Sequence, residues 1–373
     1  MLDFALQFKA LDDFMDVGAE ALQVFLEISQ QDLAIVGGGV VGLLTAAELL
    51  RAGCQVSIFD AAVERPPASW AGGGILSPLY PWRYPAPVTA LVQGADRAYQ
   101  SLAQRFQADG YGDIGFLRCG MQVRDEPLPD KAIAWAKNAG WPLEVKDTGI
   151  WLPSVATLNN ASLLGALRAW LRDQGVRFIN ERVSSVASSP PLAALVVDRQ
   201  QVSFDRILVA AGAWSGGVLS SLGIQLPLHP VKGQMLRYEG VPRPSSVILE
   251  ARGYLIPRSD GAVLVGSTVE PGESDQRPTR QGYLALTRLA ADLLPALAGR
   301  SPVAHWAGLR PGTDRALPWL GELPEQPNIF LATGHYRNGL VCAPASARIM
   351  AALIQGTPPE LDISPYAISG LAV

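Results

Sequence analysis

The sequence predicts an α/β protein in which a discontinuous, Rossmann-like dinucleotide-binding domain is combined with a second, α+β domain that has an antiparallel sheet. Three observations carry this prediction: a glycine-rich turn after the first strand, a fully apolar strand much later in the chain, and alternating strands over residues 227–266. An apolar strand of this kind is typical of a parallel sheet buried on both faces. The first domain must therefore be built from segments that lie far apart in the sequence.

The glycine-rich turn is the motif GGGVVG at 37–42, which follows a predicted strand at 33–36. Its GxGxxG spacing allows a tight turn, close approach of a pyrophosphate and packing of helix on sheet, and the helix expected at 40–52 directs free N–H groups at the phosphates. Asp60 closes the next strand, at 55–59, where a carboxylate can accept from a ribose hydroxyl. The alternative is an ordinary β-turn, but strand, helix and acid in register favour a dinucleotide site.

Composition excludes several classes of function. The chain has 373 residues, 49% of them hydrophobic, and a net charge of -4 without basic clusters, so we expect no nucleic-acid partner. No apolar run reaches the roughly 18 residues that span a bilayer. Cys54, Cys119 and Cys342 are odd in number and widely spaced, which predicts free thiols in a cytoplasmic protein and neither disulfides nor a metal site.

Residues 1–30 precede the first strand and mix apolar with acidic side chains. They lack the basic region and the small-residue cleavage site of a secretory signal. Two interpretations stay open: an amphipathic helix that binds a partner or a surface, or an extension without a role, which we favour.

The other elements are predicted from periodicity. A glycine-dense loop at 68–78 lets the backbone lie against a flat ligand. The apolar run at 207–211 is expected to be a central parallel strand. The remaining expected helices lie at 89–108, 161–173 and 280–297, and the remaining expected strands at 116–123, 176–180, 233–238, 253–258 and 262–266.

The antiparallel strands make a domain suited to covering a cofactor and shaping a substrate pocket. The predicted domain boundaries follow from this division. They are an N-terminal extension at 1–30, the dinucleotide-binding domain at 31–85, 156–224 and 305–373, and the substrate domain at 86–155 and 225–304.

Four motifs stand in order along the chain: GGGVVG at 37–42, AGAW at 211–214, GLRPGT at 308–313 and GHYRNG at 334–339. Together they resemble the D-amino acid oxidase superfamily of flavoproteins, and most closely its glycine oxidase (ThiO) branch of thiamine biosynthesis, over about residues 32–357. The resemblance implies a D-amino acid oxidase-like fold with a non-covalent FAD. Related sarcosine oxidases tether the flavin through a cysteine near the arginine motif; Gly308 stands at that position, so covalent FAD is not expected.

The resemblance also implies the substrate-binding residues. Arg310 matches the arginine that binds the substrate carboxylate, and a planar guanidinium suits that task because it binds a carboxylate bidentately. Tyr254 matches its hydroxyl partner. The alternatives are an ion-paired surface arginine and a half-buried sheet aromatic. Arg252 and Val269 stand where the family can have a histidine and a methionine, so we expect Arg252 to widen acceptance toward acidic substrates and Val269 to enlarge the pocket.

A third candidate, Arg337, precedes the last helix, which we expect to begin near Ala343 because Pro344 is tolerated only in a first turn. The positive end of that helix would face the flavin edge where negative charge gathers on reduction. The alternative for Arg337 is a helix-entry residue bonded to loop carbonyls.

The cofactor contacts are also carried over from the family. Val183 matches a backbone contact on the adenine side, although an ordinary core valine is an equal alternative. The expected FAD-binding residues are Gly37, Gly39, Val40, Val41, Gly42, Asp60, Ser69, Gly73, Gly74, Ile75, Val183, Gly212, Trp214, Gly334, His335, Tyr336, Arg337, Asn338, Gly339 and Leu340.

The resemblance implies oxidation of glycine, sarcosine or small D-amino acids by hydride transfer to flavin N5, with O₂ as the second substrate and with imine, glyoxylate, ammonia and H₂O₂ as products. Such chemistry requires orientation of the substrate more than an acid–base pair. We also expect a homo-oligomer. Three alternatives stay open: a dehydrogenase that passes electrons to a quinone or another acceptor, a flavin-binding subunit of a larger amine dehydrogenase, and a nicotinamide-dependent dehydrogenase.

Overall fold

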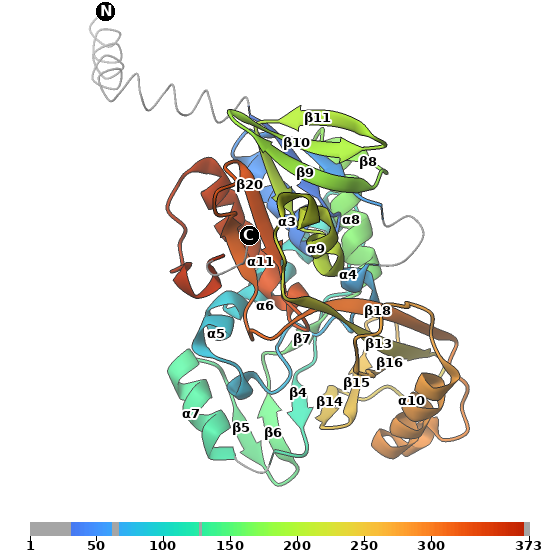
Figure 1. The fold of residues 1–373 in the computed structure, drawn as a ribbon. Coiled ribbons are helices and arrows are strands. Elements are labelled where there is room, and N and C mark those ends of the chain that lie inside the picture. The colour runs from blue at the N-terminus through green and yellow to red at the C-terminus, as the bar shows by residue number, and fades with distance from the viewer. Residues whose placement is uncertain (1–30, 62–66, 127–128, 369–373) are drawn as a thin grey trace, which may run out of the picture.

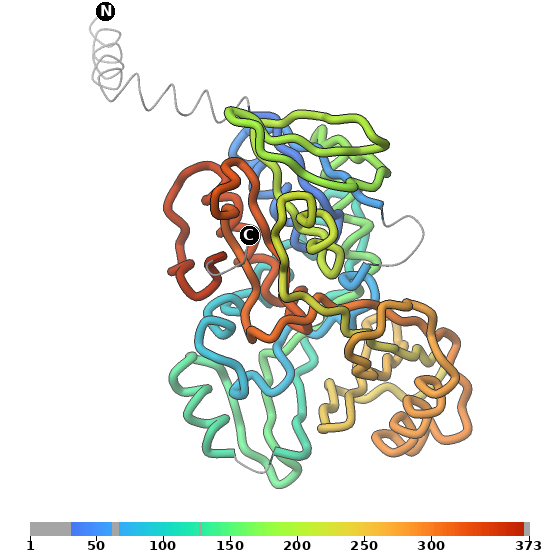
Figure 2. The backbone as a smooth tube through the Cα atoms, in the orientation of Figure 1, coloured from blue at the N-terminus to red at the C-terminus, as the bar shows by residue number. Residues whose placement is uncertain are grey.

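A computed structural model describes residues 31–61, 67–126 and 129–368 of the chain. The predictions for residues 1–30 lie outside these described residues. Figure 1 shows one unit with a mainly parallel sheet, in the upper part of the view, and a second unit with an antiparallel sheet below it. Figure 2 shows that stretches far apart in the chain, among them its blue and its red parts, build the upper unit, while blue-green and orange stretches lie in the lower one.

The upper unit is organised around a six-stranded sheet with the order β19-β20-β12-β1-β2-β8, parallel except for β19. The apolar run of the sequence forms β12, which is hydrogen-bonded to β1 on one side and β20 on the other and is buried from Ile207 to Val209. The prediction of a central parallel strand is thus confirmed. The bounds are β1 (Asp32–Val36), β2 (Gln55–Phe59), β8 (Arg177–Ile179), β12 (Arg206–Val209), β19 (Trp319–Glu322) and β20 (Ile329–Thr333).

Both faces of this sheet are covered. Leu33 and Ile35 of β1 join a core that is formed mainly with helices, whereas Ala34 and Val36 pack toward a three-stranded antiparallel sheet on the opposite face. Alternate residues of this strand therefore pack into two different cores, which explains why the strand is apolar from Leu33 to Val36. The covering elements are α3 (Val40–Arg51), α8 (Asn160–Asp173) and α11 (Gly339–Gln355) on one face, and β9 (Val183–Ser189), β10 (Leu192–Val197), β11 (Gln200–Phe204) and α9 (Ser215–Leu219) on the other.

The lower unit has a nine-stranded sheet in which β18 pairs along most of β13. Helix α10 packs on the face of this sheet that turns away from the upper unit, beside Leu236 and Leu255. The bounds are β4 (Met121–Val123), β5 (Glu144–Lys146), β6 (Gly149–Leu152), β13 (Leu228–Tyr238), β14 (Val247–Glu250), β15 (Gly253–Pro257), β16 (Val263–Gly266), β17 (Glu270–Pro271), β18 (Ala304–Thr313), α7 (Pro129–Ala139) and α10 (Arg280–Leu293).

Several short elements join the two units or differ from their predictions. The helix expected at 89–108 is two helices, because Gly94 adopts a positive φ of 74° between them. The helix expected at 280–297 ends at Leu293 and is followed by a 3₁₀ turn, Pro295–Leu297. The remaining elements are α4 (Ala68–Ala71), α5 (Ala86–Val92), α6 (Ala95–Ala108), β3 (Leu117–Arg118), β7 (Ala156–Thr157), and the 3₁₀ turns Pro81–Arg83, Gly212–Trp214, Ser220–Leu222 and Ser364–Tyr366.

The start of the last helix was predicted wrongly. α11 begins at Gly339, so Pro344 lies inside the helix and not in its first turn. A proline there has no N–H for the carbonyl four residues earlier, which is that of Leu340. The Tyr99 hydroxyl, on α6, donates to this Leu340 oxygen at 2.8 Å and supplies the missing partner. A tertiary contact therefore permits a helix that local rules exclude.

This contact predicts the effect of Tyr99→Phe. Tyr99 is fully buried, so the variant leaves the Leu340 carbonyl without a donor, and we expect the free energy of unfolding to fall by about 1–3 kcal/mol. Urea denaturation followed by circular dichroism measures it as a lower midpoint at an unchanged slope. Tyr111→Phe is the matched control, since that hydroxyl bonds Asp173 at an exposed position. Equal midpoints for the two variants would contradict the assignment.

Two further findings concern the chain as a whole. Within the described ranges, every helix is too short or too polar to cross a bilayer. Cys54, Cys119 and Cys342 are in no disulfide, in agreement with the prediction.

Candidate active site

A cavity of about 540 Å³ lies where the carboxyl ends of the parallel strands meet the antiparallel sheet. This volume is in the range typical of cofactor and small-molecule sites, roughly 300–1,000 Å³. The cavity wall is contributed by the turn after β1, the loop around α4, the turn after β12, strands β13, β15 and β18, and the segment that enters α11. Segments from both units therefore meet in one site.

The glycine-rich turn packs as its motif requires. Gly37 has a φ of 114°, and a Cβ there would stand 2.5 Å from the Ala210 carbonyl oxygen. A Cβ on Gly42 would stand 2.1 Å from the Gly37 oxygen, so this glycine allows α3 to approach the strand. Gly37, Gly39, Val40 and Val41 line the cavity. Gly42 does not, and its part is packing alone.

Asp60 lies at the cavity wall, where it could reach a cofactor, but it has a partner that the sequence does not reveal. Arg168 of α8 forms an ion pair with Asp60 and also donates to the Gly38 carbonyl at 2.8 Å. A Cβ on Gly38 would collide with both side chains, at 2.4 and 2.6 Å, so this middle glycine is needed as well. Arg168 holds the acid against the glycine turn. No local sequence pattern relates two residues 108 positions apart.

The loop around α4 contacts the start of α3 directly. The Ser69 hydroxyl accepts from the Val40 N–H at 3.0 Å, so that particular N–H is not available to a phosphate as we expected. Gly73 and Gly74 continue the cavity wall, with Ile75 and Ser69. Buried Arg258 supports them from behind, donating to the carbonyls of Gly73, at 3.2 Å, and Leu158. The predicted Ser69, Gly73, Gly74 and Ile75 thus lie together at the site.

The register of the antiparallel sheet places the substrate candidates on one face. Met235 of β13 is opposite Gly266 of β16, and Gly266 is opposite Tyr254 of β15. Two residues along, Gly233 is opposite Gly308 of β18, and Arg310 follows on the same face of β18. Except for Gly266, these residues line the cavity. The predicted pair, Arg310 and Tyr254, is therefore brought together, with Met235 as a neighbour that sequence reasoning missed; its Sδ lies 3.6 Å from the Tyr254 hydroxyl.

Arg310 has the electrostatic setting of an anion-binding group. Burial lowers the pKa of its guanidinium, Arg337 lowers it further, and the nearby Tyr254 acts in the opposite direction. Its hydrogen bonds go to the neutral Ser267 hydroxyl at 2.8 Å and the Thr268 carbonyl at 3.4 Å. Among the described residues, none of the ion pairs includes Arg310, which excludes the alternative of an ion-paired arginine within this part of the chain. A half-buried cation that has only neutral partners favours an anionic ligand.

The guanidinium of Arg310 lies over Gly233, which gives a second prediction. A Cβ at position 233 would stand 2.1–2.4 Å from three guanidinium atoms, so Gly233→Ala must displace the group. We expect the KM for an amino-acid substrate to rise about tenfold with flavin binding retained, as for a lost charge-assisted hydrogen bond. Steady-state kinetics measures this. Gly217→Ala is the control because no atom lies near its Cβ position. An unchanged KM in Gly233→Ala would show that substrate binding does not depend on the present position of the Arg310 guanidinium.

The entry into α11 forms the wall nearest the upper unit. His335, Tyr336, Arg337, Asn338, Gly339 and Leu340 all line the cavity. The Arg337 side chain is exposed, and no hydrogen bond from it to a loop carbonyl is found among the described residues, which speaks against the helix-entry alternative there. Because α11 begins at Gly339, its first N–H groups belong to residues of the cavity wall, as the positive end of a helix facing the site requires. Gly334 lies outside the wall, against Trp319.

His335 plays a structural part at this wall. Its imidazole is buried and bonded to the Ser346 hydroxyl at 3.0 Å, and burial lowers its pKa to about 4. The ring is therefore neutral at neutral pH. It is not a proton-transfer group for chemistry near pH 7.

The opposite end of the cavity has a different character. Val183, Gly212 and Trp214, which were expected to contact the cofactor, line it together with Glu181 and Arg182. Val183 is buried, whereas the Trp214 side chain is 43% exposed at the mouth. Glu181 and Arg182 belong to no recognisable sequence motif, so the sequence alone did not indicate that they line the site.

Two substrate-pocket expectations are wrong. Arg252 lies outside the cavity, in the turn before β15, and forms ion pairs with Asp292 at 2.7 Å and Glu250 at 3.8 Å. Gly253, with a φ of 152°, redirects the chain between Arg252 and Tyr254, so the two side chains do not share a face. Val269 is 45% exposed and is likewise absent from the cavity wall. Neither residue can enlarge or charge the pocket from there.

The geometry fits a dinucleotide with a flat redox ring. The closely packed glycine turn and Asp60 line one part of the wall, Val183 and Trp214 line another, and Gly73 lies next to Tyr254. Glycines in these positions leave the backbone open to close approach by a ligand.

Comparison with known proteins agrees with this fit. A model of the FAD dependent oxidoreductase family (DAO) matches residues 32–353. The chain is 40% identical to the glycine oxidase of Pseudomonas aeruginosa over 91% of this chain and 98% of that protein. It is 30% identical to the bifunctional protein ThiO/ThiG of Synechocystis sp., over 87% of this chain and 51% of that protein. The structure resembles the glycine oxidase of Geobacillus kaustophilus with a TM-score of 0.84 at 26% identity, over 91% of this chain and 98% of that one.

Proposed function

The chain belongs to the family of FAD dependent oxidoreductases, and from this premise we propose that it is a glycine oxidase that deaminates glycine and small amines such as sarcosine and small D-amino acids. FAD is its cofactor, which replaces the alternative of a nicotinamide-dependent dehydrogenase. When bound, FAD supplies a two-electron acceptor. Glycine, water and O₂ would then give glyoxylate, ammonia and H₂O₂.

One observation carries the proposal: a half-buried guanidinium without a carboxylate partner among the described residues lines the same cavity as the Gly73–Gly74 loop. An amino acid has one strongly anionic end, its carboxylate, and Arg310 can bind that group bidentately. The Tyr254 hydroxyl, on the same face of the sheet, can donate to the same carboxylate. Binding at this end fixes where the α-carbon lies.

The other residues of the cavity wall suit a reaction in which the protein orients the substrate, and not one in which a side chain transfers a proton. Met235, Gly73 and Ile75 provide an apolar or backbone surface, and the one histidine of the wall, His335, is held neutral. The N-terminus of α11 and Arg337 contribute positive charge where a reduced flavin would gather negative charge. These groups suit a reaction that depends on positioning and a favourable field.

Oxygen consumption by the purified, FAD-loaded protein tests the proposal. We expect glycine to drive O₂ uptake with equal amounts of H₂O₂ and glyoxylate formed. Turnover with an artificial electron acceptor but no O₂ uptake would favour the dehydrogenase alternative. Reduction of the bound flavin only in the presence of a partner protein would favour the alternative of a flavin-binding subunit.

The match to a ThiO/ThiG protein also supports a role in thiamine biosynthesis, in which the imine would be the useful product. We propose the residues of the cavity wall given above as the FAD and substrate contacts. The predicted domain boundaries, cytoplasmic location and homo-oligomeric state stay predictions.

A further inference from the structure

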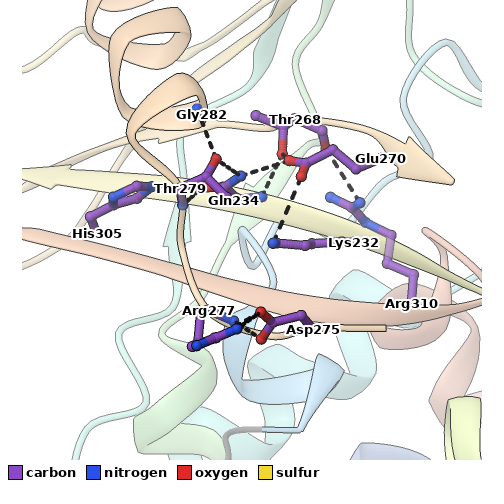
Figure 3. A network of polar contacts seen from close by, with 10 residues as sticks. All are labelled: Lys232, Gln234, Thr268, Glu270, Asp275, Arg277, Thr279, Gly282, His305 and Arg310. Atoms are coloured by element: carbon purple, nitrogen blue, oxygen red, sulfur yellow. Dashed lines mark hydrogen bonds and ion pairs between the residues drawn. The ribbon is translucent and has the colours of Figure 1, made fainter. Parts of the chain in front are cut away.

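A polar network lies behind the substrate side of the antiparallel sheet. Gly233 and Met235 of β13 face the cavity, so the alternate residues Lys232 and Gln234 face the other side, toward α10. Both are buried, with exposed fractions of 2% and 0%. Buried polar groups of this kind need partners, and Figure 3 shows the side chains that supply them.

Gln234 uses its full hydrogen-bonding capacity. Its Nε2 donates to Glu270 Oε1 at 2.7 Å and to Thr279 Oγ1 at 3.0 Å. Its Oε1 accepts from the Thr279 N–H at 2.8 Å and contacts His305 Nε2 at 2.9 Å. A backbone N–H can only donate, so this amide orientation is fixed, and His305 must carry its proton on Nε2. Gln234 thus ties together both ends of the segment at 268–279.

Glu270 completes the first of these ends. It accepts from Gln234 and from the Thr268 hydroxyl, and its Oε2 lies 3.9 Å from Lys232 Nζ. The Thr268 hydroxyl in turn accepts from the Gln234 backbone N–H at 2.9 Å. The carboxylate is therefore held by two hydrogen bonds and a buried cation. Such a network specifies one position for the chain that carries it.

The same short segment bonds the substrate candidate. Arg310 Nη2 donates to the Ser267 hydroxyl at 2.8 Å, and Nη1 donates to the Thr268 carbonyl at 3.4 Å. Figure 3 shows the Arg310 guanidinium directed toward Thr268, on the side of β13 where Gly233 leaves space for it. The acceptors that aim Arg310 are thus placed by Glu270 and Gln234, neither of which lines the cavity.

We propose that Glu270 is a positioning residue for substrate binding, which acts through Thr268 and Ser267 to aim the Arg310 guanidinium. This inference rests on the proposed function, because it assigns Arg310 the substrate carboxylate. Glu270 does not touch the substrate. Its removal leaves Arg310 charged and within the cavity but without a fixed direction, and a bidentate contact depends on direction.

The variant Glu270→Gln tests the proposal, with Glu270→Asp as the conservative variant. In FAD-loaded Glu270→Gln we expect the KM for glycine and the Kd for acetate, read from flavin absorbance, to rise about five- to thirtyfold. We expect kcat to change less than threefold and the flavin spectrum to be unchanged. Glu270→Asp keeps the negative charge opposite Lys232, so the logarithm of its KM and of its Kd should rise by no more than half as much as in Glu270→Gln. Asp292→Asn, which breaks an exposed ion pair on α10, is the matched control and should leave both constants unchanged.

The double variant Arg310→Ala/Glu270→Gln separates positioning from general destabilisation. If Glu270 acts through Arg310, the Glu270→Gln effect on acetate binding disappears once Arg310 is alanine. An equal effect in both backgrounds overturns the proposal. Should Glu270→Gln not fold, Thr268→Val removes the hydrogen bond between Thr268 and Glu270 from the threonine side. Its effect on acetate binding is then compared in the same two backgrounds. If Arg310→Ala leaves the Kd for acetate unchanged, the proposed function fails. If Arg310→Ala weakens acetate binding but Glu270→Gln and Thr268→Val do not, only the positioning role of Glu270 fails.

Discussion

Arg310→Ala is expected to raise the KM for glycine by about ten- to over a hundredfold while FAD stays bound. A charge-assisted hydrogen bond to a substrate contributes about 1.5–3 kcal/mol, and each 1.4 kcal/mol is a factor of ten. The loss falls on substrate binding because Arg310 touches the substrate side of the cavity and not the glycine turn. Steady-state kinetics at saturating O₂, with the flavin absorbance recorded for each preparation, measures it.

Arg252→Ala serves as the matched control for this variant. Arg252 is also an arginine beside β15, but its side chain is 60% exposed, paired with Asp292 and outside the cavity. We expect its KM for glycine to equal that of the unaltered protein. A KM for Arg310→Ala that stays within a factor of two of this control would refute the carboxylate assignment.

Gly42→Ala is expected to abolish FAD loading or to reduce it to a small fraction of that of the unaltered protein. The added Cβ would stand 2.1 Å from the Gly37 carbonyl oxygen, and a backbone atom in a packed turn cannot give way without moving the turn itself. Moving the turn changes the surface on which we propose that the pyrophosphate of FAD lies. The ratio of flavin to protein absorbance after purification in the presence of added FAD measures the effect.

Gly165→Ala provides the control for a glycine-to-alanine change in a helix. Gly165 lies in α8, has no atom near its Cβ position and should gain stability with the substitution. Its flavin content should equal that of the unaltered protein. Full flavin content in Gly42→Ala would mean that α3 does not need its close approach to β1.

The elements that define the fold could be predicted because their signals are local. The βαβ unit around GGGVVG combines period, turn and acid within 30 residues, and the apolar run of β12 reflects burial on both faces. Candidate site residues came from short motifs that fall at the ends of these elements, where parallel strands meet a second unit. Arg310 and Tyr254 were expected from the family resemblance alone, and it is the register of the antiparallel sheet that shows them on one face.

The features that could not be predicted from the sequence depend on contacts between distant parts of the chain. Arg168 reaches Asp60 across 108 positions and Tyr99 reaches Leu340 across 241, and neither pair leaves a periodic trace in the sequence. Pro344 was misplaced for this reason, since its tolerance comes from a hydroxyl on another helix. Arg252 was misplaced because the turn at Gly253 rotates the strand start away from the pocket.

The central claim is that the Arg310 guanidinium binds the carboxylate of the substrate, and a crystal structure of the FAD-loaded protein with bound acetate tests it most directly. We expect both acetate oxygens to lie about 2.7–2.9 Å from the terminal nitrogens of Arg310, with the acetate methyl group toward the flavin ring. Acetate bound elsewhere in the cavity, with Arg310 turned toward other protein groups, would contradict it.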